Sequence, residues 1–162
     1  MNTKGFYGNE SVETNIRQIN SVLIVGDYGV TLSESGHMSS SIDTRFTYTS
    51  NENSSTATTP DMGQVNSLRV YEAGVHLLSM NNFGGRYALM DTMGDYDGTW
   101  VNDHIGNNNT NSILVIGKYN ATIYDNGDFT GNNKSFEFDS DPSSPNLSSE
   151  INWGVSTIRL FP

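Results

Sequence analysis

The sequence contains no cysteine. Disulfide bonds, thiolate metal sites and cysteine nucleophiles are therefore excluded. Long apolar runs are also missing, and none approaches the roughly 18 residues that a membrane-spanning helix needs. We therefore expect no membrane insertion. The N-terminal stretch has no apolar segment typical of a secretion signal, and the localisation stays open.

Basic residues are few. Eight Lys and Arg stand against 18 Asp and Glu, so the net charge is -10 over 162 residues, and charged residues make up only 16%. Such an acidic chain is poorly suited to bind nucleic-acid phosphates or anionic membranes. The charge is compatible with a divalent cation as a partner, and it equally serves solubility.

Short polar residues take the place of charged ones. The chain holds 20 Asn, 20 Ser, 15 Thr and 16 Gly. These types favour turns, and no window keeps apolar residues at helical spacing. A helical bundle is excluded, and helices of at most a single turn are expected. The 2 Trp, 8 Tyr and 7 Phe residues can still bury a core, which argues against a disordered chain.

A pattern of small polar residues followed by apolar residues recurs four times. The segments read INSVLIV, VNSLRVY, TNSILVI and VSTIRLF, and they share the serines Ser21, Ser67, Ser112 and Ser156. A glycine-containing turn and a second apolar run follow the first three, with runs beginning at Val30, Val75 and Ala121. Each repeat of about 45 residues thus holds about four short strands, which predicts a β-sandwich or barrel.

The third repeat places Tyr124, Phe129 and Gly131 at the spacing aromatic, four residues, aromatic, one residue, glycine. This spacing resembles the Greek-key signature of the βγ-crystallin superfamily. The corresponding positions are Leu78, Phe83 and Gly85 in the second repeat and Leu32, His37 and Ser39 in the first. The aromatics pack a folded-over hairpin, and the glycine permits a positive φ where the chain turns back. We therefore predict positive φ at Gly85 and Gly131.

The resemblance covers about residues 20–162 and implies an all-β, Greek-key β-sandwich of βγ-crystallin type. Three full motifs are expected, plus a partial N-terminal one. Residues 72–162 would form a complete two-motif domain, and residues 1–71 a degenerate or truncated one. In the latter, residues 15–25 would be the closing strand of a motif whose opening hairpin is absent. A β-trefoil, which also has three repeats of about four strands, is the structural alternative.

The resemblance also implies a calcium site, because many microbial members bind calcium through two Asn or Asp, two residues of any type, a Ser or Thr, and a Ser. The best match is NNNTNS at residues 107–112. It implies a side-chain oxygen from Asn111, a carbonyl from Asn109, and Asp125 from the loop after Tyr124, in one site at most. Val155 occupies the fifth position of the companion window, so we expect that second site to be lost. The alternative is that these Asn-Ser pairs only form turns.

Other candidate chemistry is weaker. The acidic run with Asp91, Asp95, Asp97 and Asp103 does not fit an EF-hand loop, and we expect a solvated loop. The three histidines are His37, His76 and His104. No second histidine stands at metal-ligand spacing from any of them, and His76 is expected to pack within a strand. Nucleophile elbows and phosphate-binding loops are missing, so we expect no enzyme activity.

The sequence therefore predicts a non-enzymatic, βγ-crystallin-like structural protein, with calcium as a candidate stabilising ligand. The alternative is an adhesion or carbohydrate-binding module on a cell, spore or virion surface, because exposed Tyr and Trp beside Asn and Asp suit sugars. A toxin or inhibitor component is a third option. The expected partners are calcium and a protein or glycan surface, without nucleic acid.

Overall fold

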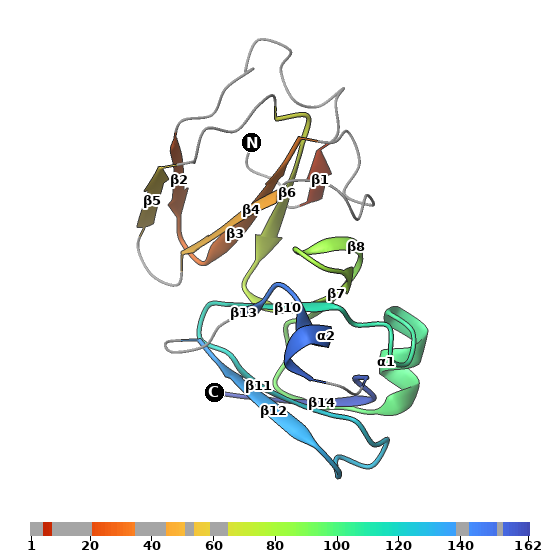
Figure 1. Cartoon of the computed structure of the whole chain (residues 1–162). Helices are drawn as coiled ribbons and strands as arrows, with labels where there is room; N and C mark the ends of the chain where they lie inside the picture. Colours follow the sequence, from red (N-terminus) through yellow and green to blue (C-terminus); the bar gives the residue numbers. More distant parts are fainter. Residues whose placement is uncertain are drawn as a thin grey trace. The chain divides into compact units, whose positions relative to one another are not determined.

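The computed structural model of the chain describes residues 5–7, 21–34, 45–50, 54–58, 65–138, 143–151 and 154–162. The chain divides into two compact units, Met1–Glu72 and Ala73–Pro162. Both units are built from short antiparallel strands, as the turn-rich composition predicts (Figure 1). In the described part, no helix is long and apolar enough to cross a membrane.

The C-terminal unit contains two successive motifs of four strands each. The first comprises β7 (Gly74–Met80), β8 (Gly84–Met90), β9 (Gly94–Tyr96) and β10 (Ser112–Ile116). The second comprises β11 (Asn120–Tyr124), β12 (Asn133–Glu137), β13 (Ser143–Ser144) and β14 (Thr157–Phe161). Two short helices lie in the long connections, α1 (Gly98–His104) and α2 (Leu147–Glu150).

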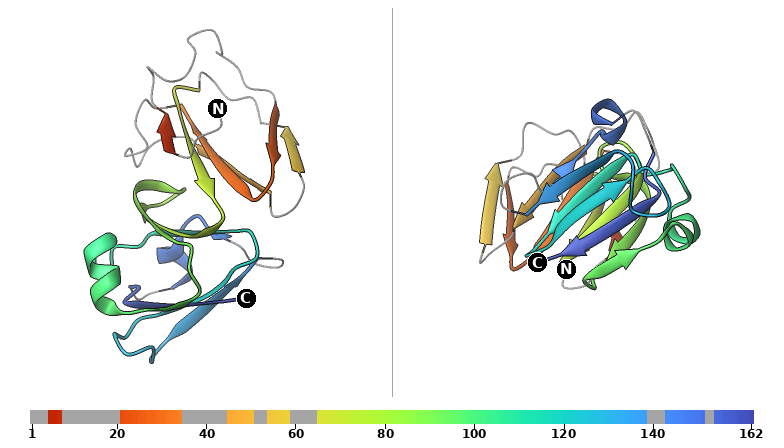
Figure 2. Two further views of the ribbon diagram at one scale, coloured as in Figure 1. Left: turned by 180° about the vertical axis from the view of Figure 1, so that it is seen from behind. Right: turned by 90° about the horizontal axis from the view of Figure 1, so that it is seen from below.

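The two motifs exchange their third strands. One sheet has the order β13-β10-β7-β8 and the other β12-β11-β14-β9, with every pair antiparallel. Each sheet therefore takes three strands from one motif and the third strand of the other. Figure 2 shows β11, β12 and β14 running side by side in cyan to dark blue. This two-sheet Greek-key sandwich confirms the predicted fold class, and its pairing of two motifs excludes the trefoil.

The core of the C-terminal unit follows from strand alternation. Val75 and Leu77 of β7 face inward together with Ile113 and Val115 of β10, because residues two apart in a strand share a face. The opposite sheet and the connections complete this core with further fully buried side chains, among them Ala121, Ile123, Phe136, Val155 and Ile158.

The N-terminal unit contains one full motif and part of another. The full motif comprises β3 (Tyr28–Ser33), β4 (Arg45–Ser50), β5 (Ser54–Thr58) and β6 (Ser67–Glu72). Two strands precede it, β1 (Gly5–Tyr7) and β2 (Ser21–Val25). The strand orders are β1-β6-β3-β4 and β2-β5. β2 covers residues 21–25 of the closing strand predicted at residues 15–25, and residues 15–20 lie outside the described residues, whereas β1 was not predicted.

The described strands of the N-terminal unit repeat the arrangement of β9 to β14 in the C-terminal unit. Phe6 of β1 pairs with Arg69 of β6, as Asp95 of β9 pairs with Arg159 of β14. The backbone N–H of Tyr28 donates to the carbonyl of Gly26, and Tyr119 donates to Gly117 in the same way. β1 to β6 therefore correspond, in order, to β9 to β14. Within the described residues, β7 and β8 have no counterpart in the N-terminal unit.

The acidic run predicted as a solvated loop instead forms β9 and α1, so that prediction is wrong. The Asp97 carboxylate caps α1 by accepting a hydrogen bond of 2.8 Å from the backbone N–H of Trp100. Val101 and Ile105, one helical turn apart, are fully buried in the core. This helix of 7 residues exceeds the single turn that we expected, because one cap and one buried pair suffice to hold it.

Candidate functional site

The two hairpin loops of the C-terminal unit have the same fold. Phe83 and Phe129 have φ of 59° and 60°, and Gly85 and Gly131 have φ of 79° and 81°. The positive φ predicted for both glycines is confirmed, and so is the equivalence of the two hairpins. The aromatic residues themselves also adopt the left-handed region, which was not predicted.

Each glycine also lies where no side chain fits. A Cβ atom on Gly131 would collide with the carboxylate of Asp125, and one on Gly85 would collide with the hydroxyl of Ser79. In the second hairpin the rings of Tyr124 and Phe129 pack edge to face, with centroids 6.1 Å apart. The loop after β11 is therefore tightly folded around Asp125.

The hydrogen bonds correct the register of the sequence repeats. The backbone N–H groups of Asn66, Asn111 and Ser156 donate to the carbonyls of Ser33, Leu78 and Tyr124, respectively. Ser156 is thus the counterpart of Asn111, and Ser33 rather than Leu32 is the counterpart of Leu78.

The hydroxyl groups of Ser112 and Thr157 support the same register. They donate to the carbonyls of Met80 and Asn126, at 2.7 and 2.8 Å. The fifth position of the companion window is accordingly Ser156, a hydroxyl, whereas Val155 is fully buried in the core. The expectation that Val155 spoils this window is wrong, because the window lies one residue further along.

The window at residues 107–112 is divided between two strand ends. Its beginning lies against the start of β14, where Asn108 N–H donates to the carbonyl of Val155, and the Asn107 side-chain oxygen accepts from the Ser156 hydroxyl at 3.0 Å. Its end lies against β7, where the Asn111 side-chain amide donates to the Ser79 carbonyl at 2.8 Å.

The three predicted calcium ligands consequently lie in different surroundings. Asn111 sits at the end of β7, and Asp125 follows β11 in the other sheet. Asn109 lies between them in sequence, and its side-chain amide donates to the carbonyl of Ile105. The structure places Asp125 close to Ser156, because Ser156 N–H donates to the neighbouring Tyr124 carbonyl.

Asp125 has one oxygen that the protein does not satisfy. Its Oδ2 atom accepts a hydrogen bond of 2.7 Å from the side-chain amide of Asn132, whereas Oδ1 is buried and lacks a hydrogen-bond partner. A buried carboxylate oxygen without a donor is costly, and a cation would relieve the cost. Oxygen atoms of Asp125, Asn107 and Ser156 are the chemistry that calcium prefers.

Sequence reasoning missed the contact between Asn107 and Ser156, and it missed that Ser156 lies beside the start of the loop with Asp125. A usable signal was present in the arginines of LRVYE and IRLFP, because aligning Arg69 with Arg159 moves Ser156 onto the position of Asn66. No cluster of three or more His, Asp or Glu residues capable of holding a metal exists in the described ranges. Any cation here would therefore rely mostly on neutral oxygens.

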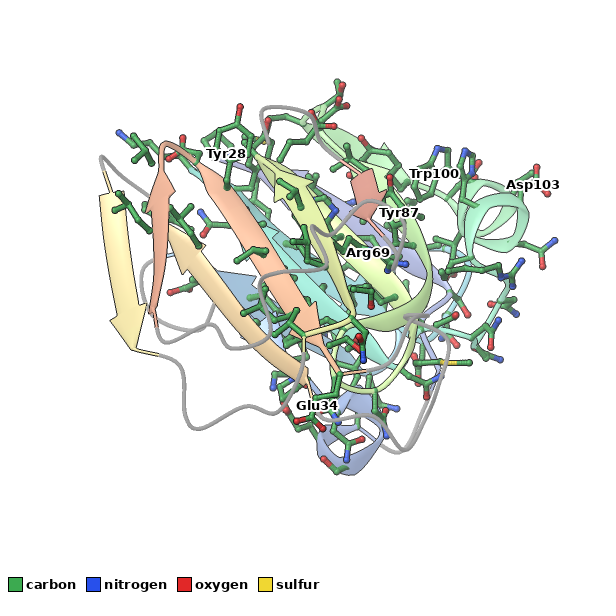
Figure 3. All side chains as sticks on the ribbon, turned by 90° about the horizontal axis from the view of Figure 1, so that it is seen from above. Tyr28, Glu34, Arg69, Tyr87, Trp100 and Asp103 are labelled. Carbon is green, nitrogen blue, oxygen red and sulfur yellow. The ribbon has the colours of Figure 1, made fainter. Side chains whose placement is uncertain are left out.

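An aromatic cluster lies on α1 and β9. The rings of Trp100 and His104 stack with centroids 4.0 Å apart, and Tyr96 meets Trp100 edge to face at 4.7 Å. Burial raises the pKa of Tyr96. Figure 3 shows Trp100 and Asp103 on this helix. His76, in contrast, is buried within β7 as predicted, and His37 lies outside the described residues.

Comparison with solved structures finds βγ-crystallin domains. One from Clostridium beijerinckii is 20% identical, with a TM-score of 0.47, and covers 54% of this chain and 97% of its own length. One from Flavobacterium johnsoniae is 23% identical, with a TM-score of 0.47, over 54% and 92%. The N-terminal domain of protein S is 23% identical, with a TM-score of 0.48, over 55% and 96%.

A double mutant of clostrillin in complex with nickel is also similar, at 20% identity and a TM-score of 0.48, over 55% of this chain and 98% of its own. No family model matches the sequence, and no curated protein matches it significantly. The exchanged third strands and the two folded hairpins, each with its glycine at positive φ, give this chain a Greek-key sandwich fold of the βγ-crystallin type.

Proposed function

We propose that the protein is a non-enzymatic structural module whose C-terminal unit is stabilised by one calcium ion at the loop after β11. The observation that carries this proposal is the buried Oδ1 of Asp125, which has no hydrogen-bond partner. The carboxamide of Asn107 and the hydroxyl of Ser156 lie at the same end of the sandwich and would add neutral oxygens.

The predicted ligand Asn111 lies instead at a different strand end, the end of β7, beside Ser79. Neither residue there carries a charge, so the end with Asp125 is the better place for a divalent cation. Asn109 lies between the two ends, and its backbone carbonyl is a candidate ligand for either one. Asp125 is therefore the central ligand, and a substitution of Asn111 tests whether the ion binds at the end of β7 instead.

A site with a single carboxylate binds weakly. We expect a dissociation constant of about 10⁻⁴ M, at the strong end of the range for extracellular calcium modules. At calcium about 100 times above that constant, mass action would add about 2.7 kcal/mol to the free energy of unfolding. The ion would act as a clamp between the loop after β11 and the start of β14.

The experiment compares thermal melting of the full chain with calcium, with magnesium and with chelator. Calcium should raise the melting temperature, and Asp125→Asn should abolish the rise. The matched control is Asp128→Asn, which removes a carboxylate from an exposed position of the same loop and should leave the calcium effect intact. Loss of the effect in Asn111→Ala instead would move the ion to the end of β7. Melting indifferent to calcium would contradict the calcium proposal.

The second candidate function is carbohydrate binding, which the cluster of Tyr96, Trp100 and His104 favours. Aromatic faces beside carboxylates such as Asp97 and Asp103 suit sugar rings and their hydroxyl groups. His104 already covers one face of Trp100, which limits the surface left for a ligand. A glycan array with the full chain tests this candidate, and binding that is lost in Trp100→Ala would favour it over a purely structural module.

A further inference from the structure

The loop after β11 contains the only Asn-Gly pair in the sequence, Asn126-Gly127. Asparagine followed by glycine is prone to spontaneous deamidation, because glycine has no Cβ atom to hinder the attack of its backbone nitrogen on the preceding side chain. Both residues are exposed, and nothing lies within 4 Å of the Cβ position of Gly127. Water therefore reaches this pair, and its backbone has room to move.

The two groups that would react are lightly held. Among the described residues, the backbone N–H of Gly127 donates no hydrogen bond. The side-chain amide of Asn126 donates one exposed hydrogen bond, to the Thr130 hydroxyl at 3.2 Å. Breaking an exposed hydrogen bond costs little, since water replaces it. The Gly127 nitrogen and the Asn126 Cγ atom can therefore approach each other without disturbing the sandwich.

The nitrogen that would leave lies beside the unsatisfied oxygen of Asp125. A Cβ atom on Gly131 would collide both with Oδ1 of Asp125 and with Nδ2 of Asn126, so the two atoms border the same small space. Asp125 Oδ1 is the buried carboxylate oxygen that lacks a hydrogen-bond partner. Replacing Nδ2 of Asn126 by an oxygen would therefore place a second anionic oxygen next to it.

We propose that Asn126 is a site of spontaneous deamidation, and that its aspartate product strengthens cation binding in the loop after β11. Deamidation itself does not depend on calcium, whereas the gain in affinity rests on the proposed calcium site. A neutral side chain would thus become a charged one by a slow covalent reaction, which changes the electrostatics of the loop without any change in the gene.

The reaction consumes only water. The Gly127 nitrogen forms a bond to Asn126 Cγ, the Cγ–Nδ2 bond breaks, and the hydrogen of the Gly127 nitrogen leaves with Nδ2 as ammonia. Water then opens the cyclic imide and returns a hydrogen to the Gly127 nitrogen. Opening at Cγ gives aspartate with an unchanged main chain. Opening at the backbone carbonyl gives isoaspartate, whose longer main chain disturbs the contact of this carbonyl with the Thr157 hydroxyl, now 2.8 Å long.

The aspartate product has an excess of negative charge in the loop. The Thr130 hydroxyl already donates its hydrogen to Asp128 Oδ1 at 2.5 Å, so it cannot also donate to a carboxylate at position 126. Without a cation, the new carboxylate would repel its neighbour Asp125. With calcium, both would attract the same ion, and calcium affinity rises with the number of charged ligands. We expect the dissociation constant for calcium to fall at least about tenfold.

The first experiment follows the reaction in the full chain, held without calcium at neutral pH and physiological temperature and then analysed by peptide mass spectrometry. Asn126 should convert to aspartate and isoaspartate faster than any other asparagine, and Gly127→Ala should slow it at least about tenfold. Asn82, exposed in the other folded hairpin but followed by Phe83, is the internal control and should remain an amide. An Asn126 that stays intact in the folded chain, while the chain unfolded in guanidinium converts, would overturn the proposal.

The second experiment uses Asn126→Asp as the pure aspartate product. Its calcium-dependent melting should have a midpoint at a calcium concentration at least about tenfold below that of the wild type. The matched control Asn82→Asp adds the same charge in the other hairpin and should leave the midpoint unchanged. A wild type indifferent to calcium would contradict the proposed function but not the conversion measured by mass. An Asn126→Asp variant with the wild-type midpoint, or one that is equally indifferent to calcium, would overturn the gain in affinity.

Discussion

Single glycines decide whether the folded hairpins can form. Gly131 combines a φ of 81° with a Cβ position that the Asp125 carboxylate already fills. Gly127, four residues earlier in the same loop, has nothing within 4 Å of its Cβ position. The two glycines therefore form a matched pair in which only the local backbone and the available space differ.

We predict that Gly131→Val lowers the free energy of unfolding by about 2 kcal/mol or more, since a branched side chain at positive φ adds strain of roughly 1–3 kcal/mol and also meets Asp125. Gly127→Val should change it by less than about 0.5 kcal/mol, as exposed substitutions usually do. Urea unfolding of both variants provides the measurement. Equal stability of the two would contradict the assignment of the hairpin glycine.

Glu150 provides a pH-dependent contact between α2 and its surroundings. It forms an ion pair with Lys134, and the Ser144 hydroxyl donates to its Oε1 at 2.5 Å. Burial raises the pKa of Glu150, but the hydrogen bonds from Lys134 and Ser144 outweigh it and hold the pKa below its ordinary value of 4.5. Because the folded-state pKa is lowered, the contact stabilises the protein at pH values above the ordinary pKa of a glutamate. This contribution is lost as the pH falls through the folded-state pKa.

Glu150→Gln should therefore destabilise the protein at neutral pH and should flatten the loss of stability on acidification below about pH 4.5. The effect will be modest, because the side chains of Lys134 and Glu150 are 26% and 35% exposed. Chemical unfolding at a series of pH values measures it. A Gln variant with the wild-type pH slope would refute the prediction.

At the scale of the element, α1 depends on its N-terminal cap. The helix has only 7 residues and no acidic residue in its first turn apart from the capping Asp97 that precedes it. Short helices are marginal on their own, so the cap and the buried pair of Val101 and Ile105 carry its stability.

Asp97→Ala should cost about 1 kcal/mol of stability through the lost cap. Asp103→Ala, near the negative end of the helix dipole, should be neutral or slightly stabilising. Thermal melting of the two variants distinguishes the stability lost with the capping hydrogen bond from the effect of removing a carboxylate charge anywhere on the helix. The reverse order of stabilities would show that Asp97 does not hold the helix.

At the scale of the whole molecule, the two units differ in completeness. The C-terminal unit has two sheets of four strands, and the described part of the N-terminal unit has four strands in one sheet and two in the other. Fewer strands bury less apolar area, so the N-terminal unit should be the less stable of the two.

We predict two unfolding transitions by calorimetry. Leu32→Ala, at a residue 2% exposed in the N-terminal unit, should lower only the first transition, and Leu77→Ala, fully buried in the C-terminal unit, only the second. Each substitution should cost about 2–5 kcal/mol in its own unit, which is the usual range for a buried leucine. A single transition that both substitutions lower would show that the units unfold as one cooperative body.

Local signals in the sequence were enough to determine most elements of the fold. Strand starts near Val30, Val75 and Ala121, the folded hairpins and the glycines at Gly85 and Gly131 all depend on residues within a few positions of each other. Alternation and turn chemistry act over that range, so a single sequence reveals them. The same locality explains the error at α1, whose few residues are too short for a helical period to show.

Only the tertiary structure decided which strands share a sheet and which polar groups meet. The exchange of β9 and β13 between sheets joins residues far apart in the chain, and it divides the window at residues 107–112 between two strand ends. Spacing alone aligned Ser156 with Ser112, whereas backbone hydrogen bonds align it with Asn111. A loop absorbs a one-residue difference without energetic penalty, while a strand ladder cannot, because a slip by one residue would turn every side chain to the other face.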